Sequence, residues 1–321
     1  MNPSHPASAS LVFGIDGGGT KTIAWLASVT GVSQTDEQMI LGKGSSGPSN
    51  QRAVGPRVAM NNLDSAIAAA FEDAGLPRQT VEAACLGLAG ADRDSDRRVV
   101  EDWADFSRLA TSVIVVNDAI PLLNTGENNG TGVALIAGTG SMAWGRNANG
   151  HTARCGGWGY LFGDEGSAFG IGRAVLIAVS RAVDGRGEQT QLVSDVIEHF
   201  KLSSPQEIVA AVYSHEVPRA VISETAFLAF SASGKGDSVA EEILRQAATE
   251  LASLVVVTAR RLELHFALSL SITGAVLLQN AGFCQQVITE IEAANTKLER
   301  TTVIPDAVAG AVNIAARRAV Q

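Results

Sequence analysis

One pattern occurs twice in the chain and limits what the chain can fold into: an apolar strand, a glycine-rich turn and a return strand. The first copy spans residues 11–27, LVFGIDGGGTKTIAWLA, with three consecutive glycines at 17–19. The second copy spans residues 132–145, GVALIAGTGSMAWG, about 120 residues later. The repeat predicts two similar halves, each opening with an antiparallel hairpin, and a cleft between the halves that is lined by both turns.

The glycines of these turns need a reason other than strand stability, because glycine loses the most conformational freedom on ordering. Without Cβ atoms, successive backbone N–H groups can line one concavity and bind a phosphate. The alternative is an ordinary glycine hairpin, which either copy alone leaves open. We expect phosphate contacts from seven residues: Gly17, Gly18, Gly19, Thr20, Gly138, Thr139 and Gly140.

Asp16 closes the first apolar strand directly before the glycines. A carboxylate at that position can hold Mg²⁺ through water, since protein-bound Mg²⁺ usually keeps several of its waters. The alternative interpretation is an aspartate that only forms the turn. We expect Asp16 to be the metal residue and leave Lys21 out of the site.

Length and charge narrow the class of protein and of partner. A chain of 321 residues suits two domains of ordinary size. The net charge of −9 makes nucleic acid or an acidic membrane an unexpected partner. The most apolar later stretch, residues 266–278, is too short and too interrupted to span a bilayer.

The termini and the cysteines predict a cytoplasmic protein. Residues 1–10, MNPSHPASAS, have no basic start and no apolar core, so we expect a disordered lead-in rather than a signal peptide. The three cysteines, Cys85, Cys155 and Cys284, lie far apart and form no CxxC pair. This spacing argues against a disulfide framework and against a zinc site.

The remaining pattern predicts an α/β chain. After the first hairpin we expect a strand near 38–43, a helix over 54–74, a strand at 83–89, a helix over 92–106 and a strand at 112–116. The second half adds a third strand near 152–156, mostly helix from 164 to 264, a strand at 268–273 and a last helix at 306–320. The expected domains are 11–117, completed by 306–321, and 118–305.

Two later positions carry groups that suit chemistry. Asp118 follows a buried strand and precedes a helix, so it is either a helix N-cap or a carboxylate at the edge where α/β sheets bind ligands. Residues 156–167, GGWGYLFGDEGS, combine glycines, aromatics and an acid. Such a loop suits a sugar, although it can also be a turn into a helix capped by Asp164 or Ser167.

Several motifs together carry a family resemblance: FGIDGGGTK, GLAGADR, NDA, IAGTGS, GGWGYLFGDEGS and ITGAV. The set resembles the N-acetylglucosamine kinase branch of the actin-like ATPase superfamily, whose wider family is labelled BadF/BadG/BcrA/BcrD ATPase. The resemblance covers most of 11–181 and again 231–315, and nothing specific is recognised in 182–230. It implies two ribonuclease H-like domains with ATP between them and transfer of its γ-phosphoryl group, with Mg²⁺, to a hexosamine hydroxyl.

The resemblance also implies roles for single residues. Asp118 becomes the catalytic base that takes the proton from the sugar O6 hydroxyl, as phosphoryl transfer requires a base near the acceptor. Thr20 and Thr139 match threonines that contact phosphate. Sugar contacts are expected from Asn50, Asp118, Gly157, Trp158, Gly159 and Asp164, and adenosine contacts from Gly236 and Gly274.

Other functions stay open at this point. The same family contains ATPases that activate a 2-hydroxyacyl-CoA or benzoyl-CoA type enzyme through an iron–sulfur cluster, which needs thiolates at a dimer interface. A sugar-sensing regulator would need a DNA-binding extension, which we do not expect in the ten-residue lead-in. The preferred sugar is expected to be N-acetylglucosamine or glucosamine, with N-acetylmannosamine and N-acetylmuramic acid as near alternatives, and the helical second half can support a homodimer.

Overall fold

The computed structural model describes residues 10–29, 39–91, 93–125, 130–214 and 218–320, and it divides into two compact units. The first unit comprises 1–131 and 306–321, and the second comprises 132–305. Ser10 begins the first strand, and the rest of the expected lead-in lies outside the described residues. No helix in the described part of the chain combines the length and apolarity that a membrane span requires.

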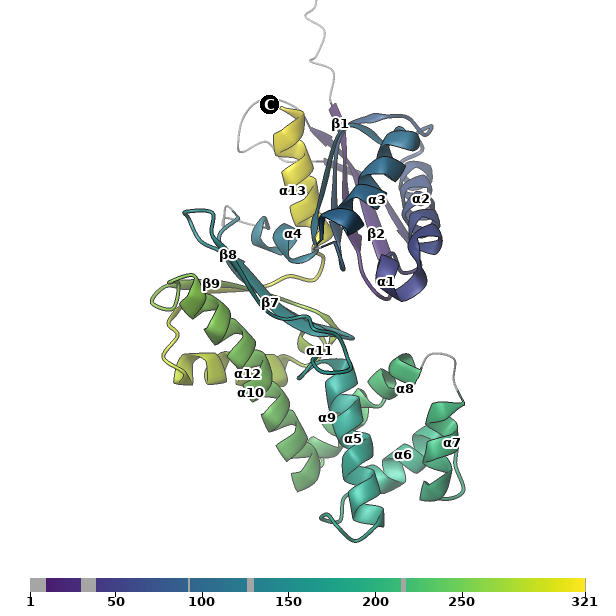
Figure 1. The fold of residues 1–321 in the computed structure, drawn as a ribbon, viewed down its shortest axis with the longest axis vertical. Coiled ribbons are helices and arrows are strands. Elements are labelled where there is room, and N and C mark those ends of the chain that lie inside the picture. Colours follow the sequence, from purple (N-terminus) through teal and green to yellow (C-terminus); the bar gives the residue numbers. More distant parts are fainter. Residues whose placement is uncertain (1–9, 30–38, 92, 126–129, 215–217, 321) are drawn as a thin grey trace, which may run out of the picture. The chain divides into compact units, whose positions relative to one another are not determined.

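The first unit is built on a five-stranded sheet in the order β3-β2-β1-β4-β5 (Figure 1). The three strands that open the chain are antiparallel, and β4 and β5 run parallel to β1. The expected strand near 38–43 is β3, although residue 38 itself lies outside the described residues. The strands are β1 Ser10–Gly17, β2 Thr22–Val29, β3 Met39–Ser46, β4 Val81–Leu88 and β5 Ala110–Asn117.

Helices cover both faces of this sheet (Figure 1). Side chains alternate along β1, so Phe13 and Ile15 join the core beneath α2 and α3, whereas Val12 packs with α13 on the other face. The C-terminal helix thus belongs to the first unit. The helices are α1 Gln51–Val54, α2 Pro56–Asp73, α3 Asp94–Phe106, α4 Ala119–Leu123 and α13 Val308–Ala319.

Two details differ from the expected boundaries. The helix expected over 54–74 is split at Gly55, which has φ +79° and separates α1 from α2. The first unit extends to Thr131 rather than to residue 117, because α4 packs within it. Pro121 of α4 fills the space beside Gly87 of β4, and Asn313 of α13 donates to the Asn124 carbonyl at 2.7 Å.

The second unit repeats the topology of the first. Its sheet has the order β10-β9-β6-β7-β8, with β6, β7 and β8 antiparallel and β9 and β10 parallel to β6. The sequence analysis missed β10, LERTTV, because it is a polar edge strand and most of its residues are exposed. The strands are β6 Gly132–Ala137, β7 Ser141–Arg146, β8 Thr152–Gly156, β9 Leu268–Thr273 and β10 Leu298–Val303.

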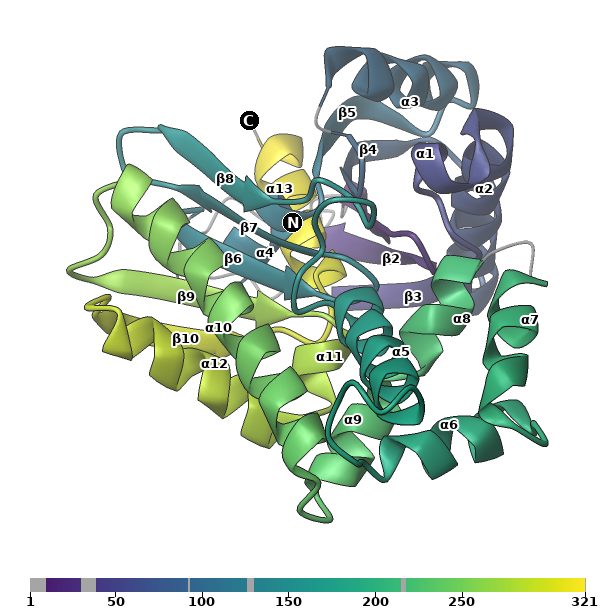
Figure 2. The same cartoon turned by 60° about the horizontal axis from the view of Figure 1, so that its bottom comes forward.

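Most of the second unit's helices lie between β8 and β9, as expected for 164–264. The long helix α10 packs against β6, β7 and β8, and α12 packs against α10 (Figure 2). The helices are α5 Ala168–Val183, α6 Leu192–Phe200, a 3₁₀ turn Pro205–Glu207, α7 Ile208–Tyr213, α8 Pro218–Glu224, α9 Ala226–Ser233, α10 Ser238–Arg261, α11 Ala275–Leu278 and α12 Ala281–Ala293. The predicted α/β class with two similar halves is confirmed.

Candidate active site

In the first unit, strand register brings the glycine turn and Asp118 to one edge of the sheet. Gly17 at the end of β1 pairs with Leu88 of β4, and Leu88 pairs with Asn117 at the end of β5. Asp118 is the next residue along the chain. Ligands of α/β sheets bind at this carboxyl edge, so the roles expected of the turn and of Asp118 are compatible with their place in the sheet.

Backbone hydrogen bonds attach Asn50 to the first glycine turn. Gly18 N–H donates to the Lys21 carbonyl at 3.0 Å, and the Gly18 carbonyl accepts from Ser49 N–H and Asn50 N–H, both at 3.1 Å. The Asn50 side chain accepts from Arg52 N–H at 3.0 Å and caps α1. Asn50 is therefore part of the same local structure as the turn.

The glycines of the turn differ in their surroundings. A Cβ on Gly17 would lie 2.2 Å from Ser49 Oγ, so packing alone requires glycine there. Among the described residues, a Cβ on Gly19 would meet no atom within 4 Å, and one on Gly18 would meet only the Lys21 carbonyl oxygen at 3.7 Å. The protein itself does not require glycine at these two positions for space, which agrees with a ligand that approaches the backbone.

Asp16 is half-buried beside this turn. Burial raises its pKa from 3.8 to about 6, Lys21 lowers it, and Asp306 before α13 raises it further. Carboxylate oxygens are the ligands Mg²⁺ prefers, and a nearby cation would remove the cost of ionising Asp16. Among the described residues no group of three or more His, Cys, Asp or Glu forms a metal cage. The Asp16 carboxylate fits a hard cation, whose charge would favour the ionised form.

Asp118 does not act as the helix cap that its position allows. Its side chain makes no capping hydrogen bond with α4. Instead, the Asn117 side chain accepts from Ala119 N–H at 2.9 Å. The capping hydrogen bond therefore comes from the neighbouring asparagine, and the role of Asp118 as a base stays a prediction.

In the second unit, the Gly138–Gly140 turn is joined to three other segments. Gly138 N–H donates to the Gly140 carbonyl at 2.9 Å, and the Gly138 carbonyl accepts from Ala168 N–H at 2.8 Å. Gly157 N–H donates to the Ser141 carbonyl at 3.0 Å. A Cβ on Gly274 would lie 2.3 Å from the Ala137 carbonyl oxygen, so Gly274 lies directly against the end of β6.

Asp164 lies against this turn and is almost completely buried, with 3% of its surface exposed. Its backbone is left-handed, with φ +61°. Oδ1 accepts from Ser141 N–H at 3.2 Å, and Oδ2 accepts from Arg219 Nη2 at 3.0 Å. Burial raises the pKa of Asp164, Ser141 and Arg219 lower it, and Glu165 raises it. The helix α5 is capped by Ser167, not by Asp164.

The rest of the loop after β8 is open. Trp158 is 65% exposed, and the Arg154 guanidinium lies 5.5 Å from its ring centre. Gly159 has φ +86°, which favours glycine at that position. An exposed ring beside backbone polar groups is the surface on which the apolar face of a sugar packs.

Gly236 is not joined to the other predicted residues. It forms the turn between α9 and α10 with φ +82°, and a Cβ there would meet no described atom within 4 Å. The following Asp237 caps α10 by accepting from Ala240 N–H at 2.9 Å. Its predicted contact with adenosine stays a prediction, as do the nucleotide contacts of Thr20, Thr139 and Gly274.

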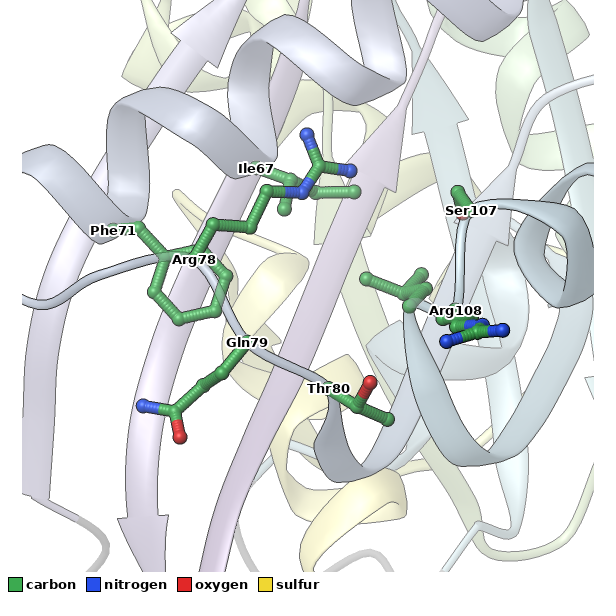
Figure 3. Close-up of a pocket in the computed structure, with 8 residues that line it drawn as sticks. Ile67, Phe71, Arg78, Gln79, Thr80, Ser107 and Arg108 are labelled. Carbon is green, nitrogen blue, oxygen red and sulfur yellow. The ribbon is translucent and has the colours of Figure 1, made fainter.

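A separate hollow in the first unit is not lined by any predicted site residue (Figure 3). It measures about 290 Å³ and lies between the end of α2, the segment before β4 and the turn before β5. Its Arg78 pairs with Asp64 at 2.5 Å. Because its lining includes none of the predicted site residues, this hollow lies outside the candidate site.

Two of the three cysteines are buried thiols. Cys85 is buried in β4, and burial raises the pKa of its thiol to about 12. Burial also raises the pKa of Cys284 in α12. Cluster ligation requires thiolates, and raised pKa values disfavour them.

Comparison with known sequences places the chain among sugar kinases. The profile of the BadF/BadG/BcrA/BcrD ATPase family matches residues 13–315. The chain is 35% identical to an N-acetylmuramic acid/N-acetylglucosamine kinase of Clostridium acetobutylicum, over 75% of this chain and 76% of that one. It is 31% identical to an N-acetyl-D-glucosamine kinase of Dictyostelium discoideum, over 77% and 79% of the two chains.

Solved structures show the same fold. A putative N-acetylglucosamine kinase from Chromobacterium violaceum superposes with a TM-score of 0.75 at 24% identity, covering 98% of this chain and 100% of that one. A hexokinase from Schistosoma mansoni complexed with glucose gives a TM-score of 0.62 at 12% identity, covering 98% and 85%. The predicted actin-like sugar kinase fold is confirmed.

Proposed function

The chain belongs to the BadF/BadG/BcrA/BcrD ATPase family, and from this premise we propose that it is an ATP-dependent kinase that phosphorylates the O6 hydroxyl of an amino sugar. Relatives named for N-acetylglucosamine and glucosamine support this class of acceptor. The iron–sulfur activator finds no support, because two of the three cysteines are buried thiols with raised pKa values.

The single observation that carries the proposal is the placement of Asp118. Asp118 follows β5 directly at the carboxyl edge of the sheet. There β5 pairs with β4, and β4 pairs with β1, the strand that leads into the glycine turn. The Asp118 side chain makes no capping hydrogen bond. A carboxylate there can accept the proton of an attacking hydroxyl while the turn holds the phosphates.

The other residues bind and orient. We propose that the backbone of 17–20 and of 138–140 binds the phosphates, and that Asn50 and the 157–164 loop bind the sugar. Asp164 accepts hydrogen bonds from sugar hydroxyls, which are strong because the acceptor is charged. Asp16 is proposed to hold Mg²⁺ through water; the cation neutralises charge on the phosphates when bound.

Among amino sugars, we propose N-acetylglucosamine or glucosamine as the preferred acceptor. A coupled assay of ADP release, run over a panel of hexoses and hexosamines, tests this. The proposal expects ADP release that depends on N-acetylglucosamine or glucosamine and is lost with EDTA. Release with plain hexoses but not with hexosamines would contradict it.

Two further predictions concern the whole protein. A cytoplasmic location and a homodimer are expected, and neither enters the chemistry above. Light scattering of the purified protein measures the oligomeric state directly.

A further inference from the structure

Arg219 lies on α8, within the segment 182–230 in which no motif was recognised, and its guanidinium contacts the candidate sugar loop. Nη2 donates to Asp164 Oδ2 at 3.0 Å and to the Thr139 carbonyl at 3.5 Å. Its guanidinium carbon lies 5.1 Å from the centre of the Tyr160 ring, within cation–π range. One side chain thus joins the glycine turn, the buried acid and an aromatic residue of the loop.

Asp164 depends on such a partner. Asp164 is almost completely buried, and its backbone is left-handed. A residue keeps such a backbone conformation only where its surroundings determine it. Ser167 Oγ donates to the Asp164 carbonyl at 2.5 Å, and Ser141 N–H occupies Oδ1. Arg219 is the cation that faces Oδ2, and Glu165 is the anion whose charge opposes ionisation.

Packing against α5 holds α8 close enough to Asp164 for Arg219 to contact it. A Cβ on Gly172 of α5 would lie 2.0 Å from the Ile222 carbonyl oxygen of α8, so the two helices approach very closely. Thr225 Oγ1 donates to the Gly172 carbonyl at 3.2 Å. Since α5 begins four residues after Asp164, this contact holds Arg219 opposite the acid.

Fold stability alone does not explain the placement. Arg219 Nε is buried and finds no hydrogen-bond acceptor among the described residues. A buried N–H left without an acceptor costs stability. The guanidinium is therefore held in a position that is unfavourable for one of its donors and favourable for Asp164.

We propose that Arg219 is a positioning residue for the sugar: it holds the Asp164 carboxylate charged and oriented so that Asp164 can accept the sugar hydroxyls. The inference rests on the proposed function, in which Asp164 binds the sugar. Arg219 acts through Asp164, and the packing of α8 on α5 brings it there.

Arg219→Met tests the inference through sugar binding. We expect the Kd and KM for the amino sugar to rise about tenfold, with the KM for ATP unchanged and kcat within about threefold. The weakening of sugar binding at low pH should also begin at a higher pH than in the wild type. Without Arg219, Asp164 loses one of the interactions that lower its pKa, whereas burial and Glu165 still raise it.

Arg219→Lys keeps the charge but loses the planar fork. It should restore the pH dependence while leaving the Kd for the sugar above the wild-type value. Because this variant is milder, it keeps the test decisive if Arg219→Met folds poorly. Arg186→Met is the matched control, since Arg186 is exposed and forms an ion pair with the exposed Asp184 at 2.7 Å, and we expect no change in sugar binding.

Calorimetry of N-acetylglucosamine and glucosamine binding without ATP, across pH, gives the readout. If both Arg219 variants, well folded, bind the sugar like the wild type at every pH, the inference is wrong and the proposed function stands. If the Arg219 variants change the KM for ATP rather than for the sugar, the inference is also wrong. If the wild type binds no amino sugar, the proposed function and this inference fail together.

Discussion

The two glycine turns share a scaffold but differ in the charges beside them. Each follows the central strand of a five-stranded sheet of the same order, and in each a glycine N–H donates to a carbonyl within its own turn. Beside the first turn, Asp16 has a raised pKa and a second acid, Asp306, nearby. Beside the second turn, the acid Asp164 is paired with Arg219.

This difference teaches how one duplicated topology supports two tasks. The first unit keeps an acid whose charge lacks full compensation, which suits a site that receives a cation and a proton. The second unit places a fixed arginine against its acid, whose pKa burial also raises, and this pairing suits a rigid hydrogen-bond acceptor for sugar hydroxyls. The predictions below test this division of tasks.

Asp118→Asn should have the largest effect, because it removes the proposed base from the first unit. We expect kcat to fall about 10²–10⁴-fold, since general base catalysis contributes that much. The KM for the sugar and the melting temperature should change little. Steady-state ADP release measures kcat and KM, and thermal unfolding measures the melting temperature. Near-native turnover would show that Asp118 is not the base.

Asp164→Ala tests the second unit's task. Loss of two charge-assisted hydrogen bonds should raise the KM for the sugar by about 100-fold, with a much smaller effect on the KM for ATP. Kinetics with each substrate varied in turn give the two values. An unchanged KM for the sugar would mean that the Asp164–Arg219 pair only stabilises the loop.

Gly19→Ala and Gly138→Ala ask whether the turns serve the same ligand group. A Cβ at either position meets no atom of the described part of the chain within 4 Å, so the free energy of unfolding should change by less than about 1 kcal/mol. Both variants should nevertheless raise the KM for ATP by about tenfold, because the methyl group fills space proposed for phosphate.

Gly282→Ala is the matched control for this pair. Gly282 lies in α12 and also has open space around its Cβ position, so its substitution should leave the KM for ATP unchanged. If only one of the two turn variants changes the KM for ATP, the turns do not share a task.

The smallest of these effects is expected from Asp16→Asn. It concerns the free energy of unfolding of the metal-free protein, which should rise rather than fall. The folded-state pKa of about 6 exceeds the ordinary 3.8, so the stabilising contribution is complete below pH 3.8 and is lost as pH rises through 6. Above pH 6 the ionised group therefore destabilises the fold. Substitution should raise stability there by about 1–3 kcal/mol while lowering activity.

Thermal unfolding in EDTA at pH 5 and pH 8 measures this effect, with Glu101→Gln on the exposed surface of α3 as a control. The gain from Asp16→Asn should be larger at pH 8 than at pH 5. A loss of stability at pH 8 would mean that ionised Asp16 does not destabilise the metal-free fold.

The sequence predicted the parts of the fold that local pattern determines. Alternating apolar residues and glycine turns identified both hairpins, so the duplicated topology followed, and buried runs identified β4 and β5. The pattern missed β10, because an edge strand with exposed residues lacks an apolar face. It also assigned α4 to the second domain, whereas α4 lies in the first unit. The packing of α4 on Gly87 is a long-range contact that no local pattern shows.

Within the candidate site, the motifs predicted roles for Asp16, Asn50, Asp118 and Asp164, but none for Arg219. Arg219 is 55 residues from its partner and lies in a segment without a motif, so no local pattern connects the two. It is one of two arginines in 182–230, and the other, Arg186, is exposed, so the sequence does not separate Arg219 from a surface arginine. Tertiary packing of α5 on α8 brings the two together.

The position of the phosphate on the product tests the central claim most directly. After reaction with ATP and N-acetylglucosamine, a two-dimensional ¹H–³¹P correlation spectrum identifies the carbon that bears the phosphate. The account predicts coupling of phosphorus to the two protons on C6. Coupling to the anomeric proton, or no phosphorylated sugar with any hexosamine, would contradict it.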